Sequence, residues 1–359
     1  MGRFGDTRAV EPLIAALKDE SALVRVKAAA SLGLLADPKA MEPLIEALQD
    51  VRPAVRRSAI QSLGRFHEAR VVGPLSDLLQ DSDNDVALSA AAQLVKIGGA
   101  GLDSVLALLN QQNPEAKRVA IRALGGSKEA RACEALVSCV KEILKDSRKP
   151  PYPESDLPKE ISDALLKVDA PAVEPVISTL QDKDPLLRRW GAELLGKMND
   201  SRAAEPLLGL LRLESIDGGE EPVRDAAVMA LASLGALAVN ILIPALSDAS
   251  PIVRREVAWG LAEIQDPRVE EALLLALHED KLLIICGACK FYIERAAAPE
   301  ETLIRALKLH GDEHTAGIFL NSGNDRLAAA GRQWAKDHGY MIQSLPRFGS
   351  AASRWGSKK

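Results

Sequence analysis

Two pairs of metal-binding residue types lie in the last quarter of the chain. Cys286 and Cys289 form a Cys-x-x-Cys pair, and His310 and His314 form a His-x-x-x-His pair. Thiolates and imidazoles are the ligands that structural zinc sites use. However, 20 residues separate the two pairs, which is more than zinc fingers have. The alternative is that the cysteines fill a buried apolar position, where cysteine acts as a small hydrophobic residue.

Glycine clusters at two predicted helix ends are the next candidates, because glycine-rich loops can bind phosphate groups. These clusters, residues 98–101 and 125–128, lack the spacing of a phosphate-binding loop. A glycine that ends a helix explains them better. The scattered serine, histidine and acidic residues form no recognisable catalytic set. The sequence therefore predicts no catalytic residues, no bound metal and no cofactor.

The composition is typical of a folded globular protein. The chain has 359 residues, of which 47% are hydrophobic and 26% charged. Its 45 basic and 50 acidic residues give a net charge of −5, which argues against charge-driven binding to nucleic acids or membranes. Aromatic residues make up only 3%, so the core must consist of Ala, Leu, Val and Ile, which suits closely packed helices. Four cysteines and no apolar signal segment lead us to expect a cytoplasmic protein.

A leucine recurs along the chain at intervals of 29 to 36 residues, with one longer gap of 42. Four residues before it there is usually a small residue, and eight before it usually an apolar one. These three positions form one stripe on a helix, and the small residue lets a neighbouring helix approach closely. The reference leucines are Leu32, Leu63, Leu94, Leu124, Leu166, Leu195, Leu231 and Leu261, with Tyr292 in the ninth place.

A further predicted helix precedes each of these stripes. Its opening, Glu-Pro followed by two aliphatic residues, begins at Glu11, Glu42, Glu174 and Glu205. Proline fits the first turn of a helix, where its missing N–H would have no partner. Each unit is therefore a pair of helices, here called the first and the second helix, that must stack on its neighbours to bury its apolar side.

These units resemble HEAT repeats. The resemblance rests on an Asp-x-x-x-x-Val-Arg turn at Asp19, Asp50 and Asp248, on the Ala-x-x-x-Leu-Gly close, and on the Glu-Pro-Leu-Ile opening. More narrowly, the units are similar to the short HEAT-like repeats of phycobilin lyases and many bacterial proteins. The resemblance covers about residues 2–339. It implies an all-α fold, a right-handed α-solenoid of about nine helix-turn-helix repeats, whose second helices line the concave face.

The resemblance also implies a ladder in which the turn aspartate and the arginine link neighbouring repeats. Ala87 and Ile285 replace the basic residue in two repeats, so we expect the ladder to be interrupted there. The basic residues at the arginine position are Arg25, Arg56, Lys117, Lys159, Arg188, Arg224 and Arg254.

Deoxyhypusine hydroxylase is a HEAT-like di-iron enzyme whose metal ligands are His-Glu dyads within helices. In this sequence, His67-Glu68 falls in a predicted turn and His278-Glu279 at the end of a first helix. The two dyads are out of phase and a set of four is absent, which argues against that activity. The repeat phase also places Cys289 at a largely apolar position, which favours a core role over zinc.

The solenoid expected over residues 1–339 has insertions near residues 146–158 and 214–221. Residues 312–339 resemble the helical C-terminal cap of other bacterial HEAT proteins, and the basic residues 340–359 are predicted to be a flexible tail. At the N-terminal end, the first complete unit has an apolar side that no repeat of this sequence covers. We expect either docking there or a longer array.

One uncharged stretch, residues 226–247, is long enough to cross a bilayer. Gly235, Asn240 and Pro244 interrupt it, and it is in phase with the repeat. We therefore interpret it as two short buried helices and a turn.

The concave face is the predicted binding surface. There each second helix presents the residues two, five and six before its reference leucine. Tryptophan and arginine often anchor interfaces, and an arginine row favours an acidic or phosphorylated peptide. The alternative is that each arginine pairs with a nearby carboxylate and each tryptophan lies over the adjacent repeat. The candidates are Arg57, Arg118, Arg122, Arg189, Trp190, Met229, Arg255 and Trp259.

These patterns predict a non-enzymatic scaffold or adaptor that binds a protein or peptide on its concave face. No membrane partner is expected, and the net charge disfavours nucleic acid. Two alternatives remain open. The repeat type allows a bilin (tetrapyrrole) lyase-type chaperone or enzyme, and the arginine row allows DNA binding, as in HEAT-like alkylpurine glycosylases.

Overall fold

The computed structural model divides into two compact units, Met1–Pro175 and Val176–Lys359. The residues that the structure describes are 7–66, 68–146, 156–213, 221–278, 300–311, 313–345 and 352–358.

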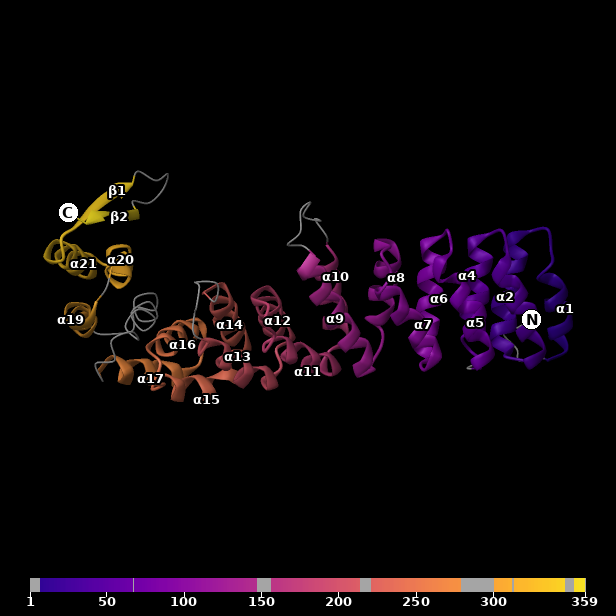
Figure 1. The fold of residues 1–359 in the computed structure, drawn as a ribbon, viewed down its shortest axis with the longest axis horizontal. Coiled ribbons are helices and arrows are strands. Elements are labelled where there is room, and N and C mark those ends of the chain that lie inside the picture. The colour runs from indigo at the N-terminus through magenta and orange to yellow at the C-terminus, as the bar shows by residue number, and fades with distance from the viewer. Residues whose placement is uncertain are drawn as a thin grey trace. The chain divides into compact units, whose positions relative to one another are not determined.

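The first unit is built from pairs of helices. The second helices α2, α4, α6 and α8 pack side by side in sequence order, and α5 and α7 pack against them in another row (Figure 1). The first helices are α1 (Val10–Ala16), α3 (Met41–Glu46), α5 (Val72–Asp77), α7 (Ala100–Leu109) and α9 (Ala130–Asp146). The second helices are α2 (Ala22–Leu35), α4 (Pro53–Leu63), α6 (Asn84–Ile97), α8 (Pro114–Leu124) and α10 (Leu157–Val168).

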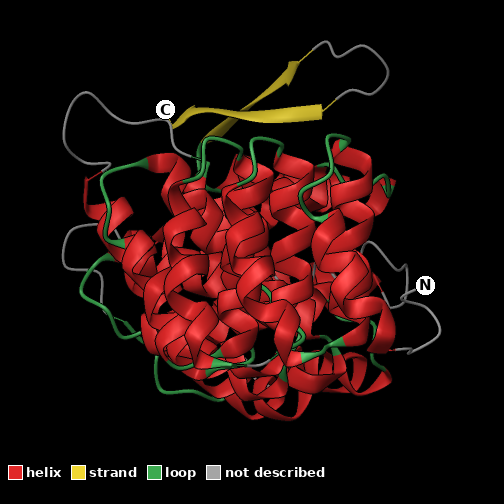
Figure 2. Ribbon diagram, turned by 90° about the vertical axis from the view of Figure 1, so that its right-hand side faces the viewer, coloured by secondary structure: helices red, strands yellow, loops and turns green. Residues whose placement is uncertain are grey.

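The second unit continues the alternation, and the described residues of both units confirm the predicted all-α repeat fold (Figure 2). Helix α11 (Ala170–Thr179) contains the boundary between the units. The further helices are α12 (Pro185–Met198), α13 (Ala204–Leu211), α14 (Glu221–Leu234), α15 (Ala236–Ala245), α16 (Pro251–Glu263), α17 (Pro267–His278), α19 (Glu300–His310), α20 (Glu313–Leu320) and α21 (Asp325–Asp337).

The reference leucines are buried as predicted, with one correction in α10. There Leu165 is fully buried and Leu166 only partly, so Leu165 is the reference residue. Both leucines fit the count along the sequence. The packing of Ala164 against Gly125 of the preceding second helix selects between them. The ninth position, Tyr292, lies outside the described residues.

Small residues set the distance between neighbouring second helices. The glycine after a reference leucine packs against the residue before the next reference leucine, and this contact recurs at Gly33, Gly64, Gly125 and Gly196. A Cβ atom on Gly196 would lie 2.8 Å from the Cα atom of Ala230. Because that neighbour is backbone, no side-chain rotation relieves such a clash. The Leu-Gly close is therefore a packing requirement of the stack.

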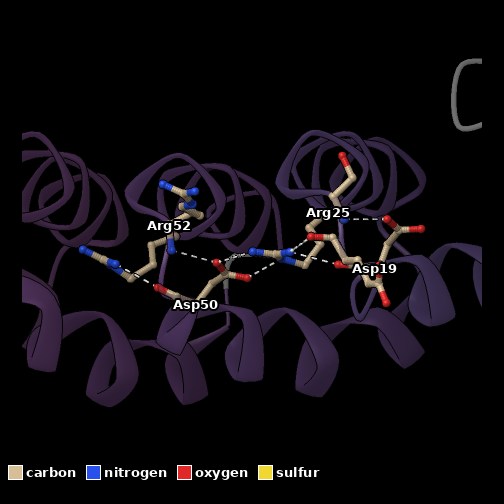
Figure 3. A network of polar contacts seen from close by, with 7 residues as sticks. Asp19, Arg25, Asp50 and Arg52 are labelled. Atoms are coloured by element: carbon tan, nitrogen blue, oxygen red, sulfur yellow. Dashed lines mark hydrogen bonds and ion pairs between the residues drawn. The ribbon is translucent and has the colours of Figure 1, made fainter.

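Arg25 joins the turn of its own repeat to the next turn (Figure 3). Its Nε donates to Asp50 Oδ2 at 2.6 Å and its Nη2 to Asp50 Oδ1 at 2.9 Å. Its Nη1 donates to the backbone carbonyl of Asp19 at 2.9 Å. The Arg25 and Asp50 side chains are only 13% and 12% exposed. A two-point, largely buried pair of this kind holds geometry better than an ordinary surface ion pair.

Arg56 forms the next link of the ladder, and the ladder is interrupted after it. Arg56 donates through Nη1 to the Asp50 carbonyl at 2.8 Å and through Nη2 to Asp81 Oδ1 at 2.6 Å. In α6 the buried Ala87 occupies the arginine position and can donate nothing, which confirms the predicted interruption. Ile285, the other predicted interruption, lies outside the described residues.

The assignment of Lys159 to the ladder is wrong. With Leu165 as the reference residue of α10, the ladder position falls on Pro158, and Lys159 is exposed. In the second unit, three arginines fasten their own turns by donating to backbone carbonyls. These bonds are Arg188 Nη1 to Asp182 at 2.6 Å, Arg224 Nη1 to Leu213 at 3.4 Å, and Arg254 Nη1 to Asp248 at 2.7 Å.

The last segment differs from the flexible tail expected over residues 340–359. Strands β1 (Tyr340–Leu345) and β2 (Ala352–Lys358) pair antiparallel. The Tyr340 ring stacks on Trp334 of α21 with a centroid separation of 5.7 Å. The amino-acid composition of this segment did not predict strands, because the hydrogen bonds between β1 and β2 join residues that are separate along the chain.

The uncharged stretch forms two helices, α14 and α15, as predicted. Gly235 separates them and has φ +54°, a left-handed conformation that glycine adopts without steric cost. Among the described residues, no helix has both the length and the hydropathy that a membrane span requires.

Substitution of Gly196 tests the packing rule. We expect Gly196→Ala to destabilise the protein by about 1–3 kcal/mol, because the new methyl group meets the backbone of Ala230. Gly209 of α13 has no atom within 4 Å of the place that a new methyl group would take, so Gly209→Ala is the matched control. It should stabilise the helix by about 0.5–1 kcal/mol. The unfolding temperatures of both variants are measured by circular dichroism. If both variants shifted the unfolding temperature in the same direction, the packing rule would be contradicted.

Replacing Asp50 tests the ladder through pH. The hydrogen bond from Arg25 lowers the pKa of Asp50 below its ordinary value. The stabilisation is therefore complete above the unfolded-state pKa and is lost as pH falls through the lowered folded-state pKa. Asp50→Asn should lower the free energy of unfolding by about 2 kcal/mol at pH 7. The difference in this free energy between variant and wild type should become smaller at acidic pH. Denaturant unfolding across pH measures this; Asp77→Asn, at an exposed position, is the control.

Candidate functional site

The outward side of the second helices is defined by the residues two and six before each reference leucine. We call it the second-helix face. In the first unit it includes Arg57, Gln61, Arg118 and Arg122, and in the second unit Arg189, Glu193, Asp225, Met229, Arg255 and Trp259.

In the first unit, the arginines of this face bind carboxylates of the next second helix. Arg57 Nη1 lies 3.2 Å from Asp85 Oδ2. Glu160 of α10 accepts from Arg118 Nε at 3.0 Å and lies 3.4 Å from Arg122 Nε. The hydrogen bond that Arg118 donates to Glu160 is the main cause that raises the pKa of Arg118. These pairs tie α4 to α6 and α8 to α10.

The arginines of the second unit are also paired. Arg189 Nε donates to Glu193 Oε1 at 2.7 Å, one turn along α12. Arg255 Nε donates to Glu256 Oε1 at 2.9 Å, and Glu256 is buried. The arginine row predicted from the sequence is therefore compensated by carboxylates in both units, as the alternative interpretation had it.

A groove of about 420 Å³ runs between α8 and α10 on this face. Its lining carries both signs of charge: Arg122, Lys159 and Lys167 are basic, and Asp156, Glu160 and Asp163 are acidic. A groove with both signs of charge favours no simple anionic ligand.

A second groove, of about 390 Å³, lies between α12 and α14. The small residues Gly196, Ala226 and Ala230 contribute to its lining, and Met229 is 62% exposed beside them. Methionine is flexible and polarisable, and it adapts to differently shaped apolar partners. Polar residues complete the lining: Arg189, Glu193, Lys197, Asp225 and Ser233.

The two candidate tryptophans occupy different repeat positions. Trp259 lies two residues before Leu261, on the second-helix face, and is half-buried. Trp190 lies five residues before Leu195, the position that Ser58 and Glu256 occupy in their repeats, and both of those residues are buried. Trp190 is itself half-buried, like Trp259, so the two differ in the side of the helix on which they lie and not in exposure.

A larger groove, which the sequence did not indicate, lies between the first helices α7 and α9. It has a volume of about 720 Å³ and is lined by Leu106, Leu109 and Ala135 together with polar residues such as Asp103 and Glu142. In the structure α9 has 17 residues and α7 has 10.

Two buried cysteines, Cys133 and Cys139, lie on α9, and Cys139 lines this groove. Burial raises the pKa of both thiols, so they stay protonated at neutral pH. A protonated, covered thiol is a poor nucleophile, which assigns both residues to packing.

The metal hypothesis falls mostly outside the described part of the chain. Cys286 and Cys289 are outside the described residues, and so are the side chains of His310 and His314. Within the described ranges, no group of three or more His, Cys, Asp or Glu residues is placed to hold a metal ion.

The family model for HEAT repeats matches residues 10–96, 41–112 and 213–285. The chain contains HEAT repeats. The repeat family expected from the sequence is thereby confirmed, and the matched residues include the ladder of α2 and α4 and the stripe of α16. No curated protein matches the chain.

Several solved structures are similar to this HEAT-repeat chain at low identity. The CpcE–CpcF complex of phycocyanin lyase from Nostoc sp. PCC7120 is 20% identical, with 65% of this chain and 92% of that chain covered and a TM-score of 0.34. Human deoxyhypusine hydroxylase in complex with glycerol is 19% identical, with 73% and 86% covered and a TM-score of 0.28. Kap121p bound to Nup53p is 12% identical, with 92% and 46% covered and a TM-score of 0.46.

Thiol labelling tests the packing role of the α9 cysteines. We expect Cys133 and Cys139 in the folded protein to react with N-ethylmaleimide at pH 7 at least 100-fold more slowly than in the unfolded chain, because burial protects them. Peptide mass spectrometry resolves the extent of labelling at each cysteine. Rapid labelling of Cys139 in the folded protein would show that its groove exposes a reactive thiol instead.

Proposed function

We propose that this HEAT-repeat chain is a non-enzymatic scaffold that binds a segment of a protein partner along the second-helix face. The observation that carries the proposal is the α12–α14 groove, where the exposed Met229 lies beside a lining of small residues. Exposed apolar side chains surrounded by polar groups are typical of protein interaction sites. Met229 and Trp259 are the proposed apolar anchors.

The compensated arginines support recognition by shape and apolar contact over recognition by net charge. Arg189 and Arg255 already hold carboxylates, so an acidic segment would have to compete with Glu193 and Glu256. The same pairing disfavours DNA, whose binding needs free cations to replace counterions. The arginines serve in this proposal as a polar rim that orients the bound segment.

Capture of the partner tests the proposal. The variant Met229→Asp with Trp259→Ala should lose the protein that immobilised wild type retains from a cell extract, by at least tenfold, because both apolar anchors are removed. Mass spectrometry quantifies the retained protein. Val51→Asp, at a position 82% exposed in the first unit, is the control and should retain it fully.

Trp190→Ala separates packing from contact. Since Trp190 is half-buried, its loss should lower the unfolding temperature, whereas Met229→Asp alone, at a position 62% exposed, should not. Equal capture by wild type and by the Met229/Trp259 variant would contradict the proposed binding face.

A further inference from the structure

The charged residues of the second-helix face in the first unit are paired between neighbouring helices. Arg57 of α4 lies 3.2 Å from Asp85 of α6, and Arg118 of α8 donates to Glu160 of α10 at 3.0 Å. Each pair joins two second helices, so charge on one helix is neutralised by the next. A ligand of this part of the face meets charges that already have partners.

The α12–α14 groove of the second unit is different, because two of its charged lining residues have no partner in the part of the chain that the structure describes. Lys197 of α12 and Asp225 of α14 line the groove and are exposed, and neither forms a hydrogen bond or an ion pair there. The other two charged lining residues, Arg189 and Glu193, bind each other along α12. The groove therefore offers one unpaired cation and one unpaired anion, on opposite walls.

The repeat geometry gives the separation of these two charges. Gly196 of α12 packs against Ala230 of α14, so these residues lie at the same level. Consecutive second helices run in the same direction, because a first helix returns the chain between them. Lys197 is therefore level with the residue after Ala230, six residues beyond Asp225. With a rise of about 1.5 Å per residue, the two charges are about 9 Å apart along the helix axes. Met229 lies between them.

We propose that the partner segment in this groove is an α-helix that carries an acidic and a basic side chain seven residues apart, with an apolar side chain between them. The inference rests on the function proposed above and names the chemistry of its partner. The acidic side chain contacts Lys197, the basic one contacts Asp225, and the apolar one packs against Met229. The apolar contact supplies most of the binding energy, and the two charges supply specificity.

A helix is the form of chain that presents three such side chains on one side. Residues four and seven positions apart lie on the same side of a helix, and seven residues span about 10 Å, close to the separation of the two groove charges. In an extended segment, residues about 10 Å apart are three positions apart and point to opposite sides. The buried lining residues Gly196, Ala226 and Ala230 are small, which lets a helix backbone approach the groove.

The same two charges disfavour a partner of uniform charge. An acidic segment would gain a contact with Lys197 but would place its second carboxylate beside Asp225. A basic segment would bind Asp225 and meet Lys197 with like charge. Such opposed contacts lower affinity, whereas a helix with both signs is attracted at both ends.

Three helical peptides test the inference. Each is alanine-rich and about 18 residues long, because shorter free helices are marginal in water. They carry leucine at one position, flanked four residues before and three residues after by glutamate and arginine, by two glutamates, or by two arginines. Fluorescence anisotropy at low salt measures their binding to the full chain. Wild type should bind the mixed peptide at least threefold more tightly than either uniform peptide, a preference typical of exposed ion pairs.

The variant Lys197→Glu should change this preference, because both unpaired groove charges are then negative. We expect it to bind the two-arginine peptide at least threefold more tightly than the mixed one. Lys96 is exposed on α6 and lies two residues after its reference leucine, as Lys197 does on α12. Lys96→Glu changes the net charge equally and is the matched control, which should keep the preference of wild type.

No binding of the mixed peptide to wild type, or equal binding of all three peptides, would overturn the inference. An equal change of preference in Lys197→Glu and Lys96→Glu would assign the effect to net charge and would overturn it too. Met229→Asp with Trp259→Ala tests the function proposed above independently. Loss of the captured protein in that variant, together with failure of the peptide test, would leave the binding face intact and reject only the charge pattern of its partner.

Discussion

The close approach of neighbouring second helices is the constraint on which the rest of the structure depends. Gly33, Gly125 and Gly196 each bring a helix so near its neighbour that a methyl group would meet Ser62, Ala164 or Ala230. With aromatic residues at 3%, the core has few large rings to fill a wider gap. Small residues therefore fix the spacing between helices, and this spacing determines the width of the grooves between them.

Charge in this protein mainly connects repeats. The pair of Arg25 and Asp50 joins two turns with little exposure to water, and Glu160 holds two arginines of α8 from α10. Consequently, the exposed charges of the second-helix face are largely committed, and the residues free to contribute binding energy are apolar. Met229, which lines the α12–α14 groove, is such a residue.

The periodicity of the sequence predicted the fold because each repeat buries the same positions, so the same pattern occurs many times along the chain. The predicted register was wrong in α10. Leu165 and Leu166 both fit the spacing of the reference leucines, and only the contact of Ala164 with Gly125 distinguishes them. The site was predicted less well. The sequence identified the arginines but not their carboxylate partners, because partners such as Glu160 lie on a neighbouring helix, 42 residues from Arg118 along the chain. The α7–α9 groove depends on helix separation, which sequence patterns do not encode.

Hydrogen exchange of the Gly196→Ala variant, resolved by peptide mass spectrometry, tests the central claim most directly. If close helix contact fixes the stack, amide exchange should accelerate in both α12 and α14, the two helices that meet at this glycine, and remain unchanged in α2 and α4. Unchanged exchange in α14, or acceleration spread evenly over the chain, would contradict the account.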